Sequence, residues 1–170
     1  KIERITPFLV DRFLLVRVYT DQGLVGTGEA GLWAHQRMVY EAIKDLSEYY
    51  IGKDPLRIEH HYQVVSRDTH FMGSVLSAAL SAIDVALWDL KAKINGEPLW
   101  KTLGASSRRV KAYASDIGLN LSDDDLRQFY ERMAALGVHA GKLKVGLDRD
   151  DELRRLGLGL LGHPHGVGRI

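Results

Sequence analysis

The sequence predicts an α+β domain followed by the first units of a parallel βα fold. Three observations lead to this fold class: extended segments with tight turns at the start, one long helical stretch in the middle, and strand and helix patterns that then alternate at roughly 30 residues per unit. We expect a first domain over residues 1–105 and two βα units over 106–156. The irregular tail over 157–170, where glycines and Pro164 break the periodicity, is not expected to form a stable helix.

The opening residues predict a three-stranded antiparallel meander. Residues 13–20 are rich in β-branched and aromatic side chains, and Asp21-Gln22-Gly23 follows as a turn. Residues 24–29 would return as the partner strand, and residues 1–8 would add the third strand.

Helical periodicity begins near Ala34. Val39, Ile43 and Leu46 repeat at helical spacing, and Pro55 favours a second helix that starts close to it.

The strongest predicted helix runs from about residue 72 to residue 94. Its apolar side chains are spaced four and three apart, and alanines beside them allow close packing, so we expect a central and largely buried helix. Asn95-Gly96 should stop it, and Pro98 should prevent it from resuming. The apolar stripe consists of Leu76, Leu80, Ile83, Leu87, Leu90 and Ile94.

Strands are then predicted over residues 110–114 and 140–145, each followed by a helix. Ser122 and the three aspartates after it resemble a capping box, and Gly137 should end the helix that starts there. Asp148 should cap the next helix, over residues 150–156. The apolar face of the first of these helices consists of Leu126, Phe129, Met133 and Leu136.

Charge and composition exclude several classes of partner. Lys plus Arg number 23 and Asp plus Glu number 22, so the formal net charge is +1, without the basic excess of a domain that binds nucleic acid. No apolar run approaches the ~18 to 20 residues of a membrane-spanning helix, and Lys1 to Thr6 lacks the core of a signal peptide. The absence of cysteine removes disulfides and thiolate chemistry. We expect a cytoplasmic protein.

The sharpest chemical feature is Lys142-Leu143-Lys144, in the second parallel strand. Side chains alternate along a strand, so both lysines share a face if Leu143 packs on a helix. At the carboxyl end of a barrel strand, the inward face holds catalytic groups. Two neighbouring ammonium groups destabilise each other's charge, so one can act as a base, which suits proton abstraction next to a carboxylate. Solvated lysines at a frayed strand end are the alternative.

Two further patterns are weaker. Residues 26–31 formally match GxGxxG, but residues 48–55 read as a turn where a dinucleotide site needs a parallel strand, so we expect these glycines to let a hairpin strand twist and turn. His60-His61 and the pair His163 and His165 lack a carboxylate cluster at metal-ligand spacing, and we expect solvated histidines.

Aromatic side chains lie in two loops, one after the third predicted strand and one before the long helix. Trp33, with His35 nearby, lies in the first loop, and His70-Phe71-Met72 forms the second. Exposed aromatic residues in such loops can form substrate walls, and packing in a satellite core is the alternative.

Several linked motifs resemble one enzyme family. Residues 79–93 followed by 98–104 closely resemble a signature of the mandelate racemase/muconate-lactonizing branch of the enolase superfamily. Gly26-Thr27-Gly28-Glu29 is similar to the family's hairpin motif. Residues 110–115 resemble its first barrel strand, and Lys142-Leu143-Lys144-Val145-Gly146 resembles the KxK motif on its second.

This resemblance implies an enolase-like N-terminal capping domain followed by the first βα units of a truncated (β/α) TIM-type barrel. The activity it implies is abstraction of the proton α to a carboxylate, with Mg²⁺ stabilising the enediolate. By resemblance, Lys144 would be the general base, and Lys142 would activate it and touch the substrate carboxylate or a metal-bound oxygen. Asp84 and Asp89 would be structural. The specificity-determining loops would contain Gly31, Leu32, Trp33, His70, Phe71 and Met72.

The sequence also departs from the family pattern. The family's three metal-binding carboxylates lie on its third to fifth barrel strands and its opposing His-Asp base comes later, so we expect no metal ligands in this chain and Mg²⁺ ligands beyond residue 170. The residues after Arg109 are too few for a barrel of about 200 residues. We expect a truncated or frame-shifted product, or an incompletely recorded sequence.

The function that the resemblance implies is an acid-sugar dehydratase acting on a small carboxylate. A racemase, epimerase or cycloisomerase of the same branch is one alternative, and a non-catalytic remnant acting as an association module is another. We expect a homo-oligomer, with neither nucleic acid nor membrane as partner.

Overall fold

The computed structural model divides the chain into two compact units, Lys1–Arg108 and Arg109–Ile170. Within the described residues, no helix combines the length and the apolar character that crossing a bilayer requires. The described residues are 1–68, 70–115, 121–138, 140–144 and 148–161.

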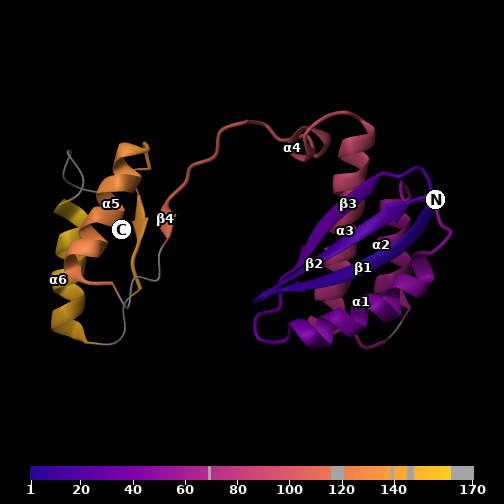
Figure 1. The fold of residues 1–170 in the computed structure, drawn as a ribbon, viewed down its shortest axis with the longest axis horizontal. Coiled ribbons are helices and arrows are strands. Elements are labelled where there is room, and N and C mark those ends of the chain that lie inside the picture. The colour runs from indigo at the N-terminus through magenta and orange to yellow at the C-terminus, as the bar shows by residue number, and fades with distance from the viewer. Residues whose placement is uncertain (69, 116–120, 139, 145–147, 162–170) are drawn as a thin grey trace. The chain divides into compact units, whose positions relative to one another are not determined.

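A three-stranded antiparallel sheet opens the first unit (Figure 1). Its strands lie in the order β1 (Ile2–Val10), β2 (Phe13–Thr20) and β3 (Val25–Ala30). Gly23, in the turn between β2 and β3, has a φ of 77°, which favours glycine. Every second residue of β2 is buried, so one face of the sheet covers the core. The predicted meander is confirmed.

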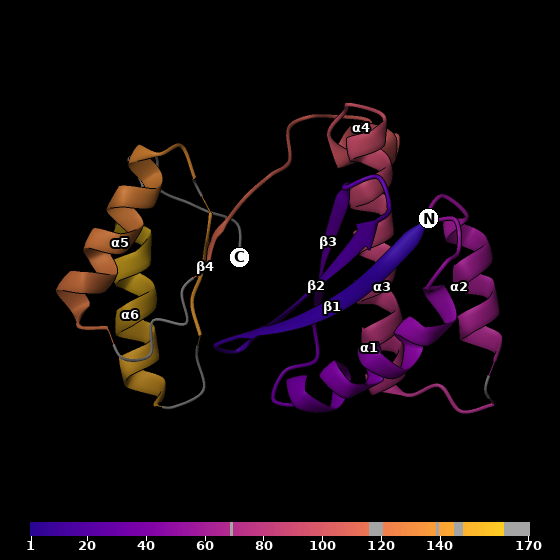
Figure 2. The same ribbon diagram turned by 45° about the vertical axis from the view of Figure 1, so that its right-hand side comes forward.

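Helices α1 and α3 pack on this sheet, and α2 packs on α3 (Figure 2). Helix α2 begins three residues after Pro55, later than predicted, because Asp54 Oδ1 accepts a hydrogen bond from the Leu56 N–H (2.9 Å) and holds a turn there. Helix α3 does not continue past Ile94, and a new short helix starts at Leu99, directly after Pro98. The helices are α1 (Gln36–Tyr50), α2 (Ile58–Arg67), α3 (Ser74–Ile94) and α4 (Leu99–Thr102).

The close approach of α3 to β3 depends on two glycines. A β-carbon at Gly26 would lie 2.0 Å from the backbone oxygen of Ala86, and one at Gly28 would lie 2.1 Å from that of Ala82. Neither glycine has a positive φ. Their close approach to α3 gives these glycines a role that the sequence did not predict: they make room for a helix backbone. The antiparallel neighbour of β3 also differs from the parallel strand that a dinucleotide site requires.

The predicted stripe of α3 forms the centre of the first core. Its middle residues are at most 3% exposed, whereas Leu76 is half-buried and Ile94 is 44% exposed. The helix ends as predicted, with Gly96 at a φ of 66° and its N–H donating to the carbonyl of Lys93 (3.1 Å). The buried members of the stripe are Leu80, Ile83, Leu87 and Leu90.

In the described part of the second unit, β4 (Ala114–Ser115) pairs in parallel with β5 (Gly141–Lys142). Both strands are shorter than predicted. Val110 is 91% exposed and lies outside β4, because the ladder begins only where Ala114 meets its partner and its N–H donates to Ala140 (2.8 Å). The predicted end of the second strand, at residue 145, lies outside the described residues.

Helix α5 (Asp123–Ala135) begins as predicted, since the Asp125 N–H donates to Ser122 Oγ (3.2 Å). Its buried residues are Leu126 and Tyr130, whereas Leu136, predicted for the apolar face, is 74% exposed. The reason is that the helix ends before Leu136.

Helix α6 (Arg149–Leu161) also starts at its predicted cap, because Asp148 Oδ1 accepts from the N–H groups of Asp150 (3.1 Å) and Asp151 (2.9 Å). The helix continues through Leu161, so the prediction of irregular chain from Gly157 is wrong at this point. A glycine lowers helix stability by about 1 kcal/mol but keeps its N–H donor, so it need not stop the helix. The rest of the tail, with His163 and His165, lies outside the described residues.

Candidate functional site

The two lysines of the predicted site lie in and just after β5. Lys142 is exposed and lies opposite Ser115 of β4, and Lys144 is exposed two residues later. Leu143, between them, is half-buried and packs with Leu126 and its neighbours on the side of α5. The alternation thus directs Lys142 away from the helix that covers the strand pair.

Tyr130 of α5 supports the backbone that carries Lys142. Its hydroxyl donates to the carbonyl of Lys142 (3.2 Å), and a β-carbon at Gly141 would lie 2.5 Å from the tyrosine ring. Glycine therefore leaves room for the ring beneath the strand. Arg155 of α6 is 8% exposed and donates to the carbonyl of Leu121 (3.1 Å), which joins α6 to the segment before α5.

In the loop after β3, neighbouring residues have different environments. Leu32 is half-buried and packs on the first core, whereas Trp33 is 71% exposed. The guanidinium carbon of Arg12 lies 5.6 Å from the centre of the Trp33 ring. Gly31 is exposed, and a β-carbon there would meet nothing within 4 Å. The loop is anchored by Leu32 and presents Trp33.

The loop before α3 has the same organisation. His70 is exposed and Phe71 is 87% exposed, whereas Met72 is half-buried and packs on the first core. In each loop, an apolar residue anchors the backbone while an adjacent aromatic ring stays exposed. Different residues of these loops therefore match the two alternatives. Leu32 and Met72 pack against the core, whereas Trp33 and Phe71 are accessible.

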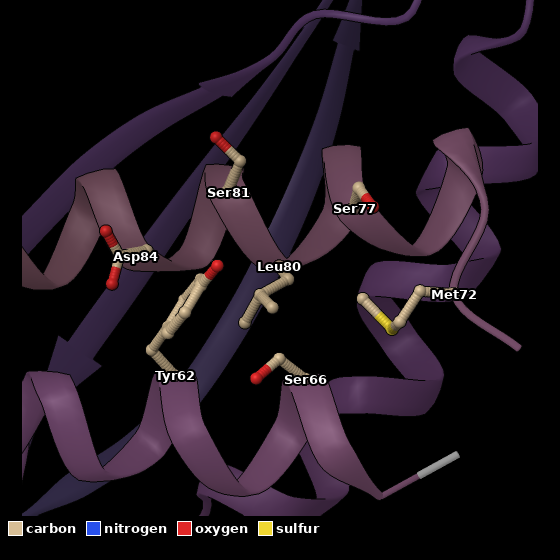
Figure 3. A pocket seen from close by; sticks show the side chains of 7 residues that line it. All are labelled: Tyr62, Ser66, Met72, Ser77, Leu80, Ser81 and Asp84. Carbon is tan, nitrogen blue, oxygen red and sulfur yellow. The ribbon is translucent and has the colours of Figure 1, made fainter. Parts of the chain in front are cut away.

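A groove of about 450 Å³, not predicted from the sequence, lies between α2 and α3 (Figure 3). Met72, in the loop before α3, lies at one end of this groove (Figure 3). Hydroxyl groups from both helices line it, and their spacing of four residues in each helix is the sequence signal that could have indicated it. The lining residues are Tyr62, Ser66, Met72, Ser77, Leu80, Ser81 and Asp84.

Two carboxylates of α3 have different environments. Burial, and then the negative charge of Glu59, raise the pKa of the half-buried Asp84. Asp89 Oδ2 accepts hydrogen bonds from the Thr27 N–H (2.8 Å) and from Lys93 Nζ (2.7 Å), and so joins the edge strand β3 to α3. For Asp89 this is the structural contact with neighbouring backbone that we expected.

The prediction of a solvated pair at His60 and His61 is wrong for His61, which is 1% exposed. Its Nε2 lies 2.8 Å from the carbonyl oxygen of Asp54 and must donate to it, so the Nδ1 of the neutral ring accepts from the Tyr49 hydroxyl (3.1 Å). Burial lowers the pKa of His61. This histidine lies on the core face of α2, where its ring nitrogens satisfy groups between α1 and α2.

The described residues do not fit a metal site by themselves. Among them, no three His, Asp or Glu side chains converge closely enough to hold a metal ion. Divalent magnesium prefers carboxylate and other oxygen ligands, and the described residues around Lys142 and Lys144 do not bring a group of them together.

Comparison with known proteins identifies the family. Residues 5–104 match the family described as "Mandelate racemase / muconate lactonizing enzyme, N-terminal domain". A D-galactonate dehydratase from Cronobacter sakazakii is 38% identical over 117 residues, which are 67% of this chain and 31% of that enzyme. The chain thus spans about a third of the length of this curated relative.

Solved structures support the same relationship. A racemase from Streptomyces coelicolor A3(2) with bound magnesium is 32% identical, with a TM-score of 0.82 over 95% of this chain and 52% of that one. The 3,6-anhydro-D-galactonate cycloisomerase from Zobellia galactanivorans is 28% identical, with a TM-score of 0.82 over 95% of this chain and 48% of that one. The resemblance to the enolase superfamily and the predicted fold class are confirmed, and the chain belongs to the mandelate racemase / muconate lactonizing enzyme family.

Proposed function

We propose that this chain is part of a Mg²⁺-dependent acid-sugar dehydratase that removes the proton α to a carboxylate and then eliminates water. The similarity to a D-galactonate dehydratase supports this choice. Racemases, epimerases and cycloisomerases of the same family are the alternatives, since a racemase and a cycloisomerase are among the proteins similar to this chain. Residues 1–105 would be the capping domain, and residues 106–156 the first two βα units of the barrel.

The observation that carries the proposal is the face of β5 on which Lys142 lies. Leu143 packs toward α5, and Lys142 lies on the opposite, exposed face with Lys144 two residues further on. In a (β/α) barrel the strand face turned away from the helices lines the interior, and catalytic groups lie at the carboxyl ends of the strands.

The two lysines would have different roles in this chemistry. The neutral amine of Lys144 would take the α-proton, so the C–H bond breaks and the electron pair delocalises into the carboxylate of the substrate. The ammonium of Lys142 would attract that carboxylate. In a dehydration, the electron pair then returns to form a carbon–carbon double bond, the C–O bond of the neighbouring carbon breaks, and the hydroxide takes a proton, such as the one that Lys144 now holds, and leaves as water. By resemblance to the family, Trp33 and Phe71 would belong to the loops that determine substrate specificity.

The magnesium ion is part of the proposal, and among the described residues no three His, Asp or Glu side chains form a group that could hold it. By resemblance to the family, we assign its ligands to later barrel strands, beyond residue 170. The small-molecule partner would be a carboxylate substrate. A homo-oligomer in the cytoplasm, without nucleic acid or membrane as partner, belongs to the same proposal.

The second candidate, a non-catalytic association module, has one observation in its favour. In the second unit, Val110 is 91% exposed, Leu136 is 74% exposed and Leu153 is 61% exposed. Apolar side chains exposed to this extent favour contact with another protein surface. Self-association without turnover by any longer chain would support this candidate.

The test of the proposed function is exchange of the substrate's α-proton with deuterium from solvent. The 170 residues are joined to the rest of a barrel, taken from their own coding sequence or from a relative, and assayed on a panel of sugar acids that includes D-galactonate. We expect exchange and turnover, and we expect Lys144→Ala to abolish both while fold and magnesium affinity stay unchanged.

Lys111→Ala is the matched control, because Lys111 is an exposed lysine of the same unit that precedes β4. It should retain exchange. Exchange that persists in Lys144→Ala with both epimers of a substrate would remove Lys144 from the role of base. An extended chain that folds, binds magnesium and turns over none of the sugar acids would contradict the dehydratase assignment.

A further inference from the structure

The tip of the β1–β2 hairpin contacts the loop after β3. Val10 pairs with Phe13, so Asp11 and Arg12 form a two-residue turn at the tip. The carbonyl of Arg12 accepts a hydrogen bond from Gln36 Nε2 (2.7 Å), at the start of α1. The backbone of the tip is therefore tied to the helix that follows the Trp33 loop.

The guanidinium of Arg12 lies near two aromatic rings. Its central carbon is 5.6 Å from the centre of the Trp33 ring and 5.4 Å from that of the Phe13 ring. A guanidinium within about 6 Å of a ring centre is attracted to the ring, and Trp is the strongest partner. Because Trp33 is 71% exposed, packing in the core does little to fix the orientation of its ring. The contact with Arg12 therefore contributes more to that orientation than it would for a buried ring.

Unusual backbone conformations occur on both sides of this contact. Among the described residues, Asp11 (φ 52°) and Ala34 (φ 65°) are the non-glycine residues with positive φ. Asp11 directly precedes Arg12, and Ala34 directly follows Trp33. Side chains with a β-carbon rarely adopt this conformation, and it persists where surrounding contacts stabilise it. The hairpin tip and the loop thus form one locally constrained unit.

We propose that Arg12 is a positioning residue that holds the indole of Trp33, and that it influences substrate selection through this ring. The positioning of Trp33 stands on the contacts above, whereas the effect on substrate selection rests on the proposed function.

The positioning is tested by fluorine NMR of the full 170-residue chain labelled with 5-fluorotryptophan. The chain has three tryptophans, and Trp33→Phe identifies the resonance of Trp33. We expect Arg12→Met to move this resonance toward its position in denaturant while the resonances of Trp88 and Trp100 stay in place. Gln36→Ala, which removes the hydrogen bond to the tip, should cause a smaller shift in the same direction.

Arg17→Met is the matched control, because Arg17 is an exposed arginine of the same sheet whose guanidinium carbon lies 5.5 Å from the ring of Phe8. It should leave the Trp33 resonance unchanged. An unchanged Trp33 resonance in Arg12→Met, or an equal shift in Arg17→Met, would overturn the positioning role. Matching far-ultraviolet circular dichroism spectra establish that each variant is folded.

The effect on substrate selection is read from steady-state kinetics of the barrel-completed enzyme. Loss of an exposed cation–π contact predicts a rise in KM of about 2- to 5-fold for Arg12→Met, with kcat changed by less than about twofold and partial recovery in Arg12→Lys. A fall in kcat without a change in KM would contradict this part. An enzyme with no turnover in the unsubstituted form would refute the proposed function, while the fluorine result would still decide the positioning of Trp33.

Discussion

Each unit of the chain places a helix on β-strands next to a glycine, but the glycine meets a different group in each unit. In the first unit, Gly28 of β3 faces the backbone oxygen of Ala82 in the 21-residue helix α3. In the second unit, Gly141 of β5 faces the ring of Tyr130 in the 13-residue helix α5. A helix backbone can give way only if the whole helix moves, whereas a ring can rotate or shift.

The hydrophobic cores of the two units also differ in how many elements build them. The core of the first unit joins buried residues from the sheet and from α1, α2 and α3. In the described part of the second unit, the buried apolar members are Ala114, Leu126 and Tyr130, with half-buried neighbours around them. The long elements of the first unit pack in several layers and tolerate little local change. The short strand pair of the second unit packs on a single tyrosine ring and tolerates more.

The largest effect is expected for Gly28→Ala, whose β-carbon would lie 2.1 Å from the Ala82 backbone oxygen. Helix α3 would have to move off the sheet, so the free energy of unfolding should fall by about 3 kcal/mol or more, measured by urea denaturation. Gly31→Ala is the control, because a β-carbon there meets nothing within 4 Å. Equal stability of the two variants would show that the helix backbone is free to shift.

Asp89→Ala tests the polar contact across the same interface. Removal of the carboxylate leaves the Thr27 N–H at the sheet edge without its acceptor, and it leaves Lys93 with only the Val25 carbonyl (2.8 Å) of its two acceptors. We expect a loss of about 2 kcal/mol in the same assay. Glu41→Ala removes an exposed pair with Lys44 (2.9 Å) and should leave the free energy of unfolding almost unchanged. A similar loss in both variants would mean that Asp89 acts only as a surface charge.

Gly141→Ala gives the corresponding measurement in the second unit. Because the added β-carbon meets the Tyr130 ring rather than backbone, we expect a loss of only about 1 kcal/mol. Hydrogen exchange of the α5 amides reads out this unit separately. The double variant Gly141→Ala/Tyr130→Leu should lose less stability than the sum of the two single variants, because the added β-carbon no longer meets the Tyr130 ring. A loss as large as that of Gly28→Ala would remove the difference between the units.

The smallest effect concerns pH and His61. Its pKa is lowered in the folded state, so below the ordinary value of about 6.5 the unfolded chain binds more protons than the folded chain. Stability should therefore fall as pH decreases through this range, with a slope below the limit of about 1.4 kcal/mol per pH unit that one proton sets. Urea denaturation between pH 7.5 and pH 5.5 measures it, and His61→Asn should flatten the slope. An unchanged slope would assign the pH dependence to other groups.

Local sequence patterns predicted most elements of the first unit. The strands and the long helix follow from side-chain periodicity, and the helix ends follow from left-handed glycines such as Gly96, since all of these are properties of neighbouring residues. Ser122 and Asp148 predicted two helix starts for the same reason. The alternation at Lys142-Leu143-Lys144 likewise predicted the face on which Lys142 lies.

Two of the predictions that were wrong, those for Val110 and His61, depend on contacts with other elements. Val110 is exposed because the parallel ladder begins at Ala114, and His61 is buried because Tyr49 and Asp54 satisfy its ring. The groove between α2 and α3 and the contact of Arg12 with Trp33 arise only when separate elements pack together.

The sequence by itself therefore determined the family, most of the element types and the alternation of side chains at Lys142-Leu143-Lys144, because motifs, periodicity and strand parity are local. The tertiary structure alone decided why Gly26 and Gly28 are glycines and which loop residues anchor and which are exposed. Those outcomes depend on the distance between backbones and on which side chains a distant element covers. A local sequence pattern contains neither.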